Sequence, residues 1–122
     1  MKSLSKKNLG ELGEKIAVDF LKKQGIKIIE KNFRSKFGEI DIIGQIDNTL
    51  VFFEVKTRST LAFGQPYEAV NKTKIKKIKK TIEYFLFKHP KFTNKALRID
   101  VLSLILDKQG KIKDIRHFKN IL

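Results

Sequence analysis

Apolar residues recur at helical spacing over two stretches of the chain. The first stretch predicts a helix over about Leu9–Gln24, with Gly25 as its C-terminal stop. Asn8, followed three residues later by Glu11, is typical of a helix N-cap and its capping-box partner. The second stretch predicts a helix over about Tyr67–Lys88, whose apolar face contains Ile75, Ile78, Ile82, Phe85 and Leu86.

Short runs of β-branched residues, or of apolar residues alternating with charged ones, predict five strands. They are Ile26–Phe33, Glu39–Ile46, Leu50–Arg58, Leu97–Leu106 and Lys111–His117. Asp47-Asn48 is expected to form a tight two-residue hairpin turn, and Ser35-Lys36-Phe37-Gly38 a looser turn. The order α-β-β-β-α-β-β predicts an α/β fold with a central mixed β-sheet flanked by helices. We expect one domain over residues 1–122, with residues 1–7 as a flexible basic N-terminus.

The charge of the chain favours a polyanionic partner. It has 27 Lys and Arg against 13 Asp and Glu, a net charge of +14, and dense positive charge attracts phosphate chains through counterion release. Nucleic acid is therefore the expected partner. A bias toward Lys, charge for solubility, or binding to a membrane surface would also explain the composition.

Composition also excludes several classes of protein. The chain has no Cys and two His, so we expect no disulfide framework, no thiolate nucleophile and no His-based zinc centre. No apolar stretch is long enough to span a bilayer, and the N-terminal residues lack the apolar core of a signal peptide. A soluble cytoplasmic protein is expected.

Acidic residues lie in two strands that otherwise look central. If Asp47-Asn48 is a two-residue turn, the numbers of facing residues sum to 95, so Asp41 faces Glu54 and Glu39 faces Lys56. A period of two then predicts all four side chains on one face of the sheet. The alternative is ordinary alternation, with the acids pointing into solvent.

Two facing carboxylates repel each other unless a cation neutralises them. Mg²⁺ prefers carboxylate oxygens, so Asp41 and Glu54 are candidate metal ligands. Lys56 would lie beside the ion and orient a water molecule or stabilise charge on a phosphate; it would also suit an ion pair with Glu39. Glu14 lies at the edge of the apolar stripe of the first helix and either approaches the pair or is a surface acid.

The same residues form a larger pattern. Asp41, twelve intervening residues and Glu54-Val55-Lys56 resemble the PD-(D/E)XK nuclease signature, without its literal Pro-Asp. The chain further resembles the YraN-like family of uncharacterised bacterial proteins, through Gly13-Glu14, Asn32, Gly38-Glu39-Ile40-Asp41, Phe53-Glu54-Val55-Lys56-Thr57-Arg58, Gly64, Pro66, Ala69-Val70, Lys74 and Arg98-Ile99-Asp100-Val101. The resemblance covers roughly Leu9–Leu106.

That family is similar in fold to archaeal Holliday-junction resolvases and restriction endonucleases. The resemblance implies a restriction-endonuclease-like core with a metal-dependent phosphodiesterase site. It implies Asp41 and Glu54 as metal ligands, Lys56 as the catalytic lysine and Glu14 as the helix-borne acid of the resolvases. Glu39 belongs to the YraN-like pattern and not to the general nuclease signature.

Basic residues concentrate at the start of the second helix, where six of the nine residues from Lys72 to Lys80 are Lys. Like charges four residues apart repel, and a phosphate backbone would relieve this repulsion. A plain amphipathic surface helix looks the same. The candidate nucleic-acid contacts are Lys72, Lys74, Lys76, Arg34, Lys36 and Arg58. Phe37 and Phe63, in expected loops, are weaker candidates for base stacking.

These observations lead to one hypothesis and one rival. The hypothesis is an endonuclease that cleaves branched or otherwise structured DNA with Mg²⁺, for which Mn²⁺ would substitute. Asp41, Glu54 and the Val55 carbonyl would hold the ion, with Glu14 and Glu39 as further ligands. A homodimer would cut two strands. The rival is a basic nucleic-acid-binding protein that keeps the fold without catalysis.

Overall fold

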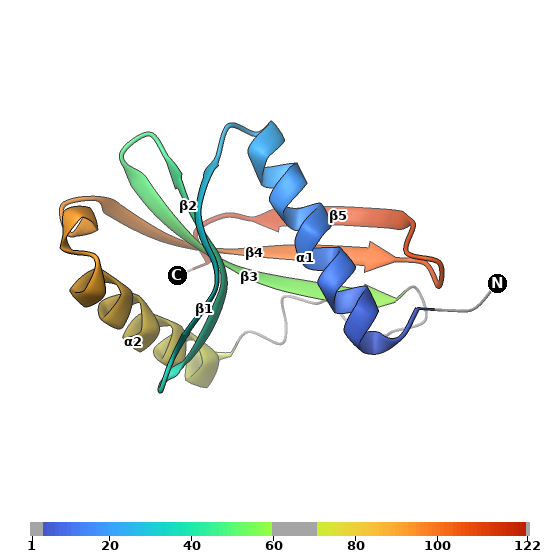
Figure 1. Ribbon diagram of the computed structural model, residues 1–122, viewed down its shortest axis with the longest axis horizontal. Coiled ribbons are helices and arrows are strands. Elements are labelled where there is room, and N and C mark those ends of the chain that lie inside the picture. The colour runs from blue at the N-terminus through green and yellow to red at the C-terminus, as the bar shows by residue number, and fades with distance from the viewer. Residues whose placement is uncertain (1–3, 60–70, 122) are drawn as a thin grey trace.

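The computed structural model describes residues 4–59 and 71–121 (Figure 1). Two helices and five strands follow in the predicted order, with a short 3₁₀ helix added after the second helix. The elements are α1 (Lys6–Lys23), β1 (Lys27–Ser35), β2 (Gly38–Ile46), β3 (Thr49–Ser59), α2 (Lys72–Lys88), η2 (Pro90–Phe92), β4 (Ala96–Leu106) and β5 (Ile112–Phe118). The predicted α/β class is confirmed.

The strands form one mixed sheet in the order β1-β2-β3-β4-β5. The β3–β4 pair is parallel and the other pairs are antiparallel. Ile46 pairs with Thr49, so Asp47-Asn48 is the two-residue turn that the sequence predicts. In the described part of the chain, neither helix is long and apolar enough to cross a membrane.

The two helices cover opposite faces of the sheet, and each face has its own hydrophobic core (Figure 1). On the α2 face, the buried side chains include Ile78, Ile82 and Phe85 of the helix together with Ile40, Ile43, Phe52 and Ile99 of the strands. On the α1 face they include Ala17 and Leu21 of the helix together with Ile42, Val51, Phe53 and Leu102 of the strands. The two cores therefore identify the face to which each strand residue points.

The first helix begins earlier than the hydrophobic pattern predicts. Its N-cap is Ser5, which has an extended backbone and accepts a hydrogen bond from the Asn8 N–H at 3.1 Å. The prediction of Asn8 as N-cap was therefore wrong. The predicted stop at Gly25 is confirmed: this residue has φ +84°, and the N–H of Ile26 reaches the carbonyl of Leu21 at 3.1 Å in a Schellman arrangement.

The positions at which the helices begin bear on two predicted segments. Residues 4–7, predicted to be part of a flexible terminus, contact the rest of the fold: the Leu4 N–H donates to the Lys108 carbonyl at 3.0 Å, and α1 begins at Lys6. The second helix begins at Lys72 because Asn71 is extended and caps the helix through the Lys74 N–H at 2.9 Å. Residues 67–70, predicted to be helical, lie outside the described residues.

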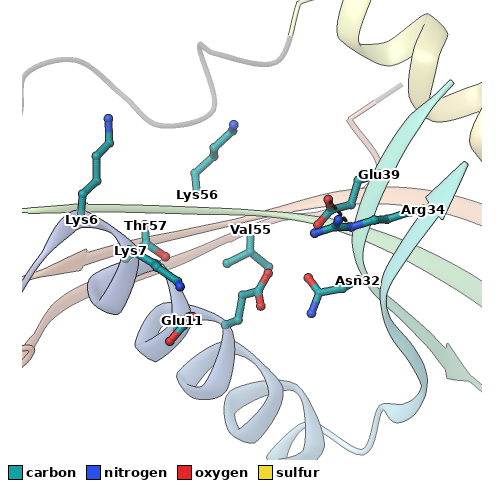
Figure 2. Close-up of a pocket in the computed structure, with 11 residues that line it drawn as sticks. Lys6, Lys7, Glu11, Asn32, Arg34, Glu39, Val55, Lys56 and Thr57 are labelled. Carbon is teal, nitrogen blue, oxygen red and sulfur yellow. Dashed lines mark ion pairs between the residues drawn. The ribbon is translucent and has the colours of Figure 1, made fainter. Parts of the chain in front are cut away.

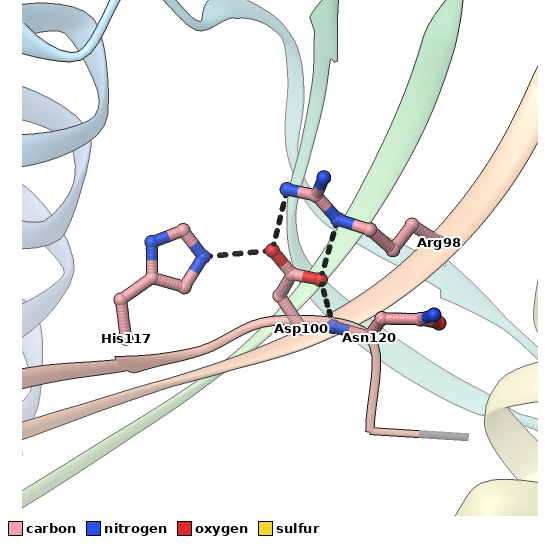
Figure 3. Close-up of polar contacts among 4 residues, drawn as sticks. All are labelled: Arg98, Asp100, His117 and Asn120. Carbon is pink, nitrogen blue, oxygen red and sulfur yellow. Dashed lines mark hydrogen bonds and ion pairs between the residues drawn. The ribbon is translucent and has the colours of Figure 1, made fainter.

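A buried carboxylate links β4 to β5 and to the segment that follows β5 (Figure 3). Asp100 of β4 is 0% exposed; it accepts two hydrogen bonds of 2.9 Å from Arg98 and one of 2.8 Å from the Asn120 N–H. His117 Nε2 of β5 lies 2.7 Å from it. Burial by itself raises the pKa of Asp100, but these hydrogen bonds outweigh burial and hold the pKa below its usual value. The cluster joins β4, β5 and the segment after β5.

Candidate metal centre

Three carboxylates converge where α1 crosses the sheet. Glu14 of α1 and Glu39 and Asp41 of β2 each have one oxygen within 4.8 Å of the others. The close approach of α1 depends on Gly13, because a Cβ atom there would lie 2.0 Å from Thr57 Oγ1 of β3. The absence of a side chain at Gly13 thus lets α1 bring Glu14 close to β2 and β3.

Strand β2 leaves β3 at the cluster. Their register is the predicted one from Ile46–Thr49 to Ile42–Phe53, and the ladder ends there. Asp41 Oδ2 instead accepts a hydrogen bond from the Val55 N–H at 2.7 Å. The predicted facing pairs Asp41–Glu54 and Glu39–Lys56 are therefore not formed, because the two strands separate before reaching them.

Glu39 has a different partner from the one that the register predicts. It pairs across the β1–β2 hairpin with Arg34, whose Nε lies 3.2 Å from Glu39 Oε2. Among the described residues, no ion pair joins Glu39 to Lys56. The second interpretation of Lys56, an ion pair with Glu39, is therefore wrong.

The charged side chains come from both faces of the sheet. Ile40 packs in the core on the α2 face, so its neighbours Glu39 and Asp41 point toward α1, where Glu14 meets them. Glu54 points to the other face and contacts Lys74 of α2. The prediction that Glu39, Asp41, Glu54 and Lys56 share one face was wrong, because β2 does not keep strict alternation: both Ile40 and Ile43 lie on the α2 face.

Glu54 is held by two lysines. Its side chain is 6% exposed, and its Oε1 lies 3.1 Å from Lys74 Nζ and 3.3 Å from Lys56 Nζ. Both ammonium groups approach the same oxygen, which offsets the cost of burying this carboxylate. Lys74, predicted from the sequence to contact phosphate, thus pairs with Glu54 on the α2 face of the sheet.

Asp41 is the most perturbed acid of the cluster. Burial, the nearby charge of Glu54 and, to a smaller extent, the charges of Glu14 and Glu39 together raise its pKa from the usual 3.8 to about 7. The hydrogen bond from Val55 opposes this shift. Near neutral pH, the Asp41 carboxyl is therefore protonated in part of the molecules, as expected for crowded carboxylates without a cation between them.

Asn32 is a residue of this centre that sequence reasoning did not single out as functional. The orientation that satisfies its amide places the nitrogen 2.9 Å from Glu14 Oε1 and 3.3 Å from Glu39 Oε1. Asn32 has φ +53°, a left-handed conformation that Asn tolerates better than most residues. The available signal was an Asn inside a strand of mostly apolar and charged residues.

The cluster borders an open hollow of about 560 Å³ between α1 and the sheet (Figure 2). In this view the side chains of Val55 and Thr57 point toward α1, whereas Lys56 points the other way. The residues lining the hollow are Lys6, Lys7, Gly10, Glu11, Glu14, Asn32, Arg34, Glu39, Val55, Lys56 and Thr57. Acidic and basic groups therefore face the same space.

The remaining predicted phosphate contacts are dispersed. Lys72 and Lys76 are exposed on α2, Arg58 lies near the end of β3, and Lys36 lies over the ring of Phe37, its Nζ 5.3 Å from the ring centroid. The Phe37 ring is also approached by Lys80 at 5.5 Å, so two ammonium groups already lie over it. Phe63 lies outside the described residues.

Comparison with known proteins places these residues in a family. The model of the family described as "Uncharacterised protein family UPF0102" matches residues 13–104. A UPF0102 protein of Dictyoglomus thermophilum is 48% identical over 118 residues, covering 96% of this chain and 98% of that protein. UPF0102 proteins of Caldicellulosiruptor saccharolyticus and Clostridioides difficile are 44% and 41% identical over 117 residues, each covering 96% of this chain and 98% of the relative.

Proposed function

This chain belongs to the uncharacterised protein family UPF0102, the YraN-like family that its motifs indicate, and from that premise we propose that it is a metal-dependent endonuclease of the PD-(D/E)XK type. Its substrate would be DNA, in branched or otherwise structured form. The observation that carries the proposal is the convergence of Glu14, Glu39 and Asp41 beside a hollow that Glu14, Glu39 and Lys56 line.

The donor set fits a hard divalent cation. Oxygen ligands lie about 2.0–2.6 Å from Mg²⁺ or Ca²⁺, so two ligands of one ion are separated by at most about 4–5 Å. The three carboxylate oxygens, all within 4.8 Å of one another, are close to this limit. Glu54 points to the other face but lies near enough for its charge to raise the pKa of Asp41, and it would join the set through Oε2, since both lysines contact Oε1. The Val55 carbonyl would add a neutral ligand. Mg²⁺ is the proposed ion, with Mn²⁺ as a substitute.

When bound, the cation would lower the pKa of a water molecule and offset the charge of the phosphate. The protein would supply the positioning groups. Asp41 would release its proton as it becomes a ligand, Asn32 would hold Glu14 and Glu39 in place, and Lys56 would orient the attacking water or stabilise charge on the phosphate.

The basic side chains would hold the DNA backbone around this centre. Arg34 lines the hollow, Arg58 lines an adjoining one, and Lys36 lies in the turn between β1 and β2. Lys72, Lys74 and Lys76 occupy the start of α2. Contacts with phosphates position a duplex without reading its sequence. Two copies of the chain, as a homodimer, would cut both strands of a junction.

The proposal is tested by strand cleavage with a matched pair of variants. The substrates are a four-way DNA junction, a linear duplex, a single strand and a structured RNA, each with Mg²⁺ or Mn²⁺. Asp41→Asn should reduce cleavage by at least about 100-fold and keep DNA binding. Asp47→Asn, the same change in the exposed β2–β3 turn, should cleave like the parent protein.

Binding without cleavage of any of these substrates would refute the nuclease proposal. It would favour the rival, a non-catalytic protein that binds nucleic acid. Cleavage that persists undiminished in Asp41→Asn would also refute the proposal, because it would locate the chemistry elsewhere or in a contaminant.

A further inference from the structure

A second hollow adjoins the one at the acidic cluster. It has a volume of about 600 Å³ and lies between the start of α1 and the end of β3, lined by Leu4, Lys6, Leu9, Lys56, Thr57, Arg58 and Ser59. The two hollows share Lys6, Lys56 and Thr57. The two adjoining hollows are together named the α1–β3 groove.

Carboxylates lie at one end of this groove. Glu11, Glu14 and Glu39 line the first hollow beside the cationic Lys6, Lys7, Arg34 and Lys56. The ionisable side chains that line the second hollow are all cationic: Lys6, Lys56 and Arg58. A ligand that carries phosphates and also needs a divalent cation would complement both ends.

Two further features suit a nucleotide chain. Lys6 and Lys56 extend toward the same side in Figure 2, so one ligand can approach both ammonium groups, that of Lys56 while it is paired with Glu54. Leu4 and Leu9 give the second hollow an apolar wall, against which a sugar or a base can pack. Cationic groups along a backbone path combined with apolar surface for bases are what single-strand binding requires.

The size of the second hollow selects the form of nucleic acid. Its volume of about 600 Å³ equals that of a cube with edges of roughly 8 Å. A base pair with both of its backbones is wider than this space, whereas one nucleotide of a single strand fits it. Hollows of several hundred cubic ångströms are the size that holds small ligands such as one nucleotide.

We infer that the α1–β3 groove holds one single polynucleotide strand next to the acidic cluster. A phosphate at the cluster lies against Lys56, and the adjoining phosphates lie on Lys6 and Arg58. The inference rests on the proposed function and specifies its substrate as a single-stranded segment, such as a flap or an opened branch. It also includes Lys6, which the sequence had assigned to a flexible terminus.

The lysines on the outer face of α2 have a different role. Lys79 and Lys80 are exposed and line neither part of the groove. They attract any polyanion without ordering it. Their removal therefore provides a control that changes the charge by the same amount.

The test measures binding and not cleavage. A fluorescein-labelled 12-nucleotide oligo-dT and a labelled 12-base-pair duplex are titrated by anisotropy with the full chain carrying Asp41→Asn, so that neither probe is cut. In this background, Lys6→Gln with Arg58→Gln is compared with Lys79→Gln with Lys80→Gln. Circular dichroism and thermal unfolding confirm that each protein is folded.

The groove variant should bind oligo-dT at least about tenfold more weakly, and its slope of log K against log salt should fall by roughly 1.4, about 0.7 for each lost contact with a single strand. The α2 variant should bind oligo-dT less than about threefold more weakly, and the groove variant should lose less affinity for the duplex than for oligo-dT. Equal losses in the two double variants, or a greater loss for duplex than for oligo-dT, would overturn the inference. Because no step depends on catalysis, the groove can fail while the nuclease proposal survives, and the reverse.

Discussion

Replacing Asp41 with Asn should stabilise the metal-free protein above neutral pH. The pKa of this buried acid is raised from 3.8 to about 7 by burial and by neighbouring carboxylates, first among them Glu54. Between these values the folded chain holds a proton that the unfolded chain has released. Stability therefore falls as pH rises from about 4 to 7, and the cost remains at higher pH.

The size of the effect follows from the shift. Each pKa unit corresponds to about 1.4 kcal/mol, so the shift of about 3 corresponds to at most about 4 kcal/mol at pH 8. Asn is uncharged and its oxygen can still accept the hydrogen bond from Val55. Allowing for imperfect replacement of the carboxyl, we expect Asp41→Asn to gain about 2 kcal/mol. This raises Tm by roughly 8 °C for a chain of this length.

Thermal unfolding in EDTA at pH 4 and pH 8 measures this gain. The variant should unfold close to the parent temperature at pH 4, where Asp41 is protonated in the folded chain and partly protonated in the unfolded chain, and at the higher temperature at pH 8. Asp47→Asn should leave Tm nearly unchanged at both values. A variant less stable than the parent at pH 8, or a gain of equal size at both pH values, would refute the reasoning and show that Asp41 is a satisfied structural group.

Three further predictions follow. Lys74→Met should strengthen Mn²⁺ binding about three- to tenfold, as measured by calorimetry, because it removes a cation that competes with the metal for Glu54. The Lys74–Glu54 pair is partly exposed and worth about 1 kcal/mol. Weaker Mn²⁺ binding would instead show that Lys74 positions this carboxylate. Gly13→Ala should lower the free energy of unfolding by about 2 kcal/mol in urea, since the added Cβ would overlap Thr57 Oγ1. Adding Thr57→Ala should restore part of this loss. An unchanged urea midpoint in Gly13→Ala would contradict the close packing of α1 on β3. Asp100→Asn should lower the free energy of unfolding by about 3–5 kcal/mol at pH 7. This loss should shrink as the pH falls below the usual range of Asp, because the lowered pKa of Asp100 stabilises the fold only while the carboxyl is ionised. A loss of stability that is independent of pH would exclude this ionic contribution.

Local sequence signals predicted the hairpin between β2 and β3 well. The Asp47-Asn48 turn sets a register that holds for five residue pairs, from Ile46–Thr49 to Ile42–Phe53. Beyond the last pair the arithmetic fails, because β2 separates from β3 and Asp41 bonds the Val55 N–H through its side chain. The rules for turn geometry do not predict where β2 separates from β3.

Helix phase predicted the position of Glu14 more successfully than strand register predicted that of Glu39. The apolar stripe places Glu14 at the edge of the face that packs on the sheet, and the structure brings it to Asp41. Glu39 joins them because its strand points it toward α1 and not toward Lys56. The site residues themselves remain a prediction, which the cleavage and binding experiments test.

The amino-acid sequence by itself determined the order of the elements, the α/β class, the main hairpin and the excess of positive charge. These depend on periodicity and turn chemistry, which act over a few residues. Only the tertiary structure decided which acids meet, that Lys74 reaches Glu54, and that Lys6 lines the same hollow as Glu14 and Glu39. Such contacts depend on how closely α1 crosses β3 at Gly13 and on where β2 separates from β3. Both are set by packing between segments distant in the chain, which no local pattern records.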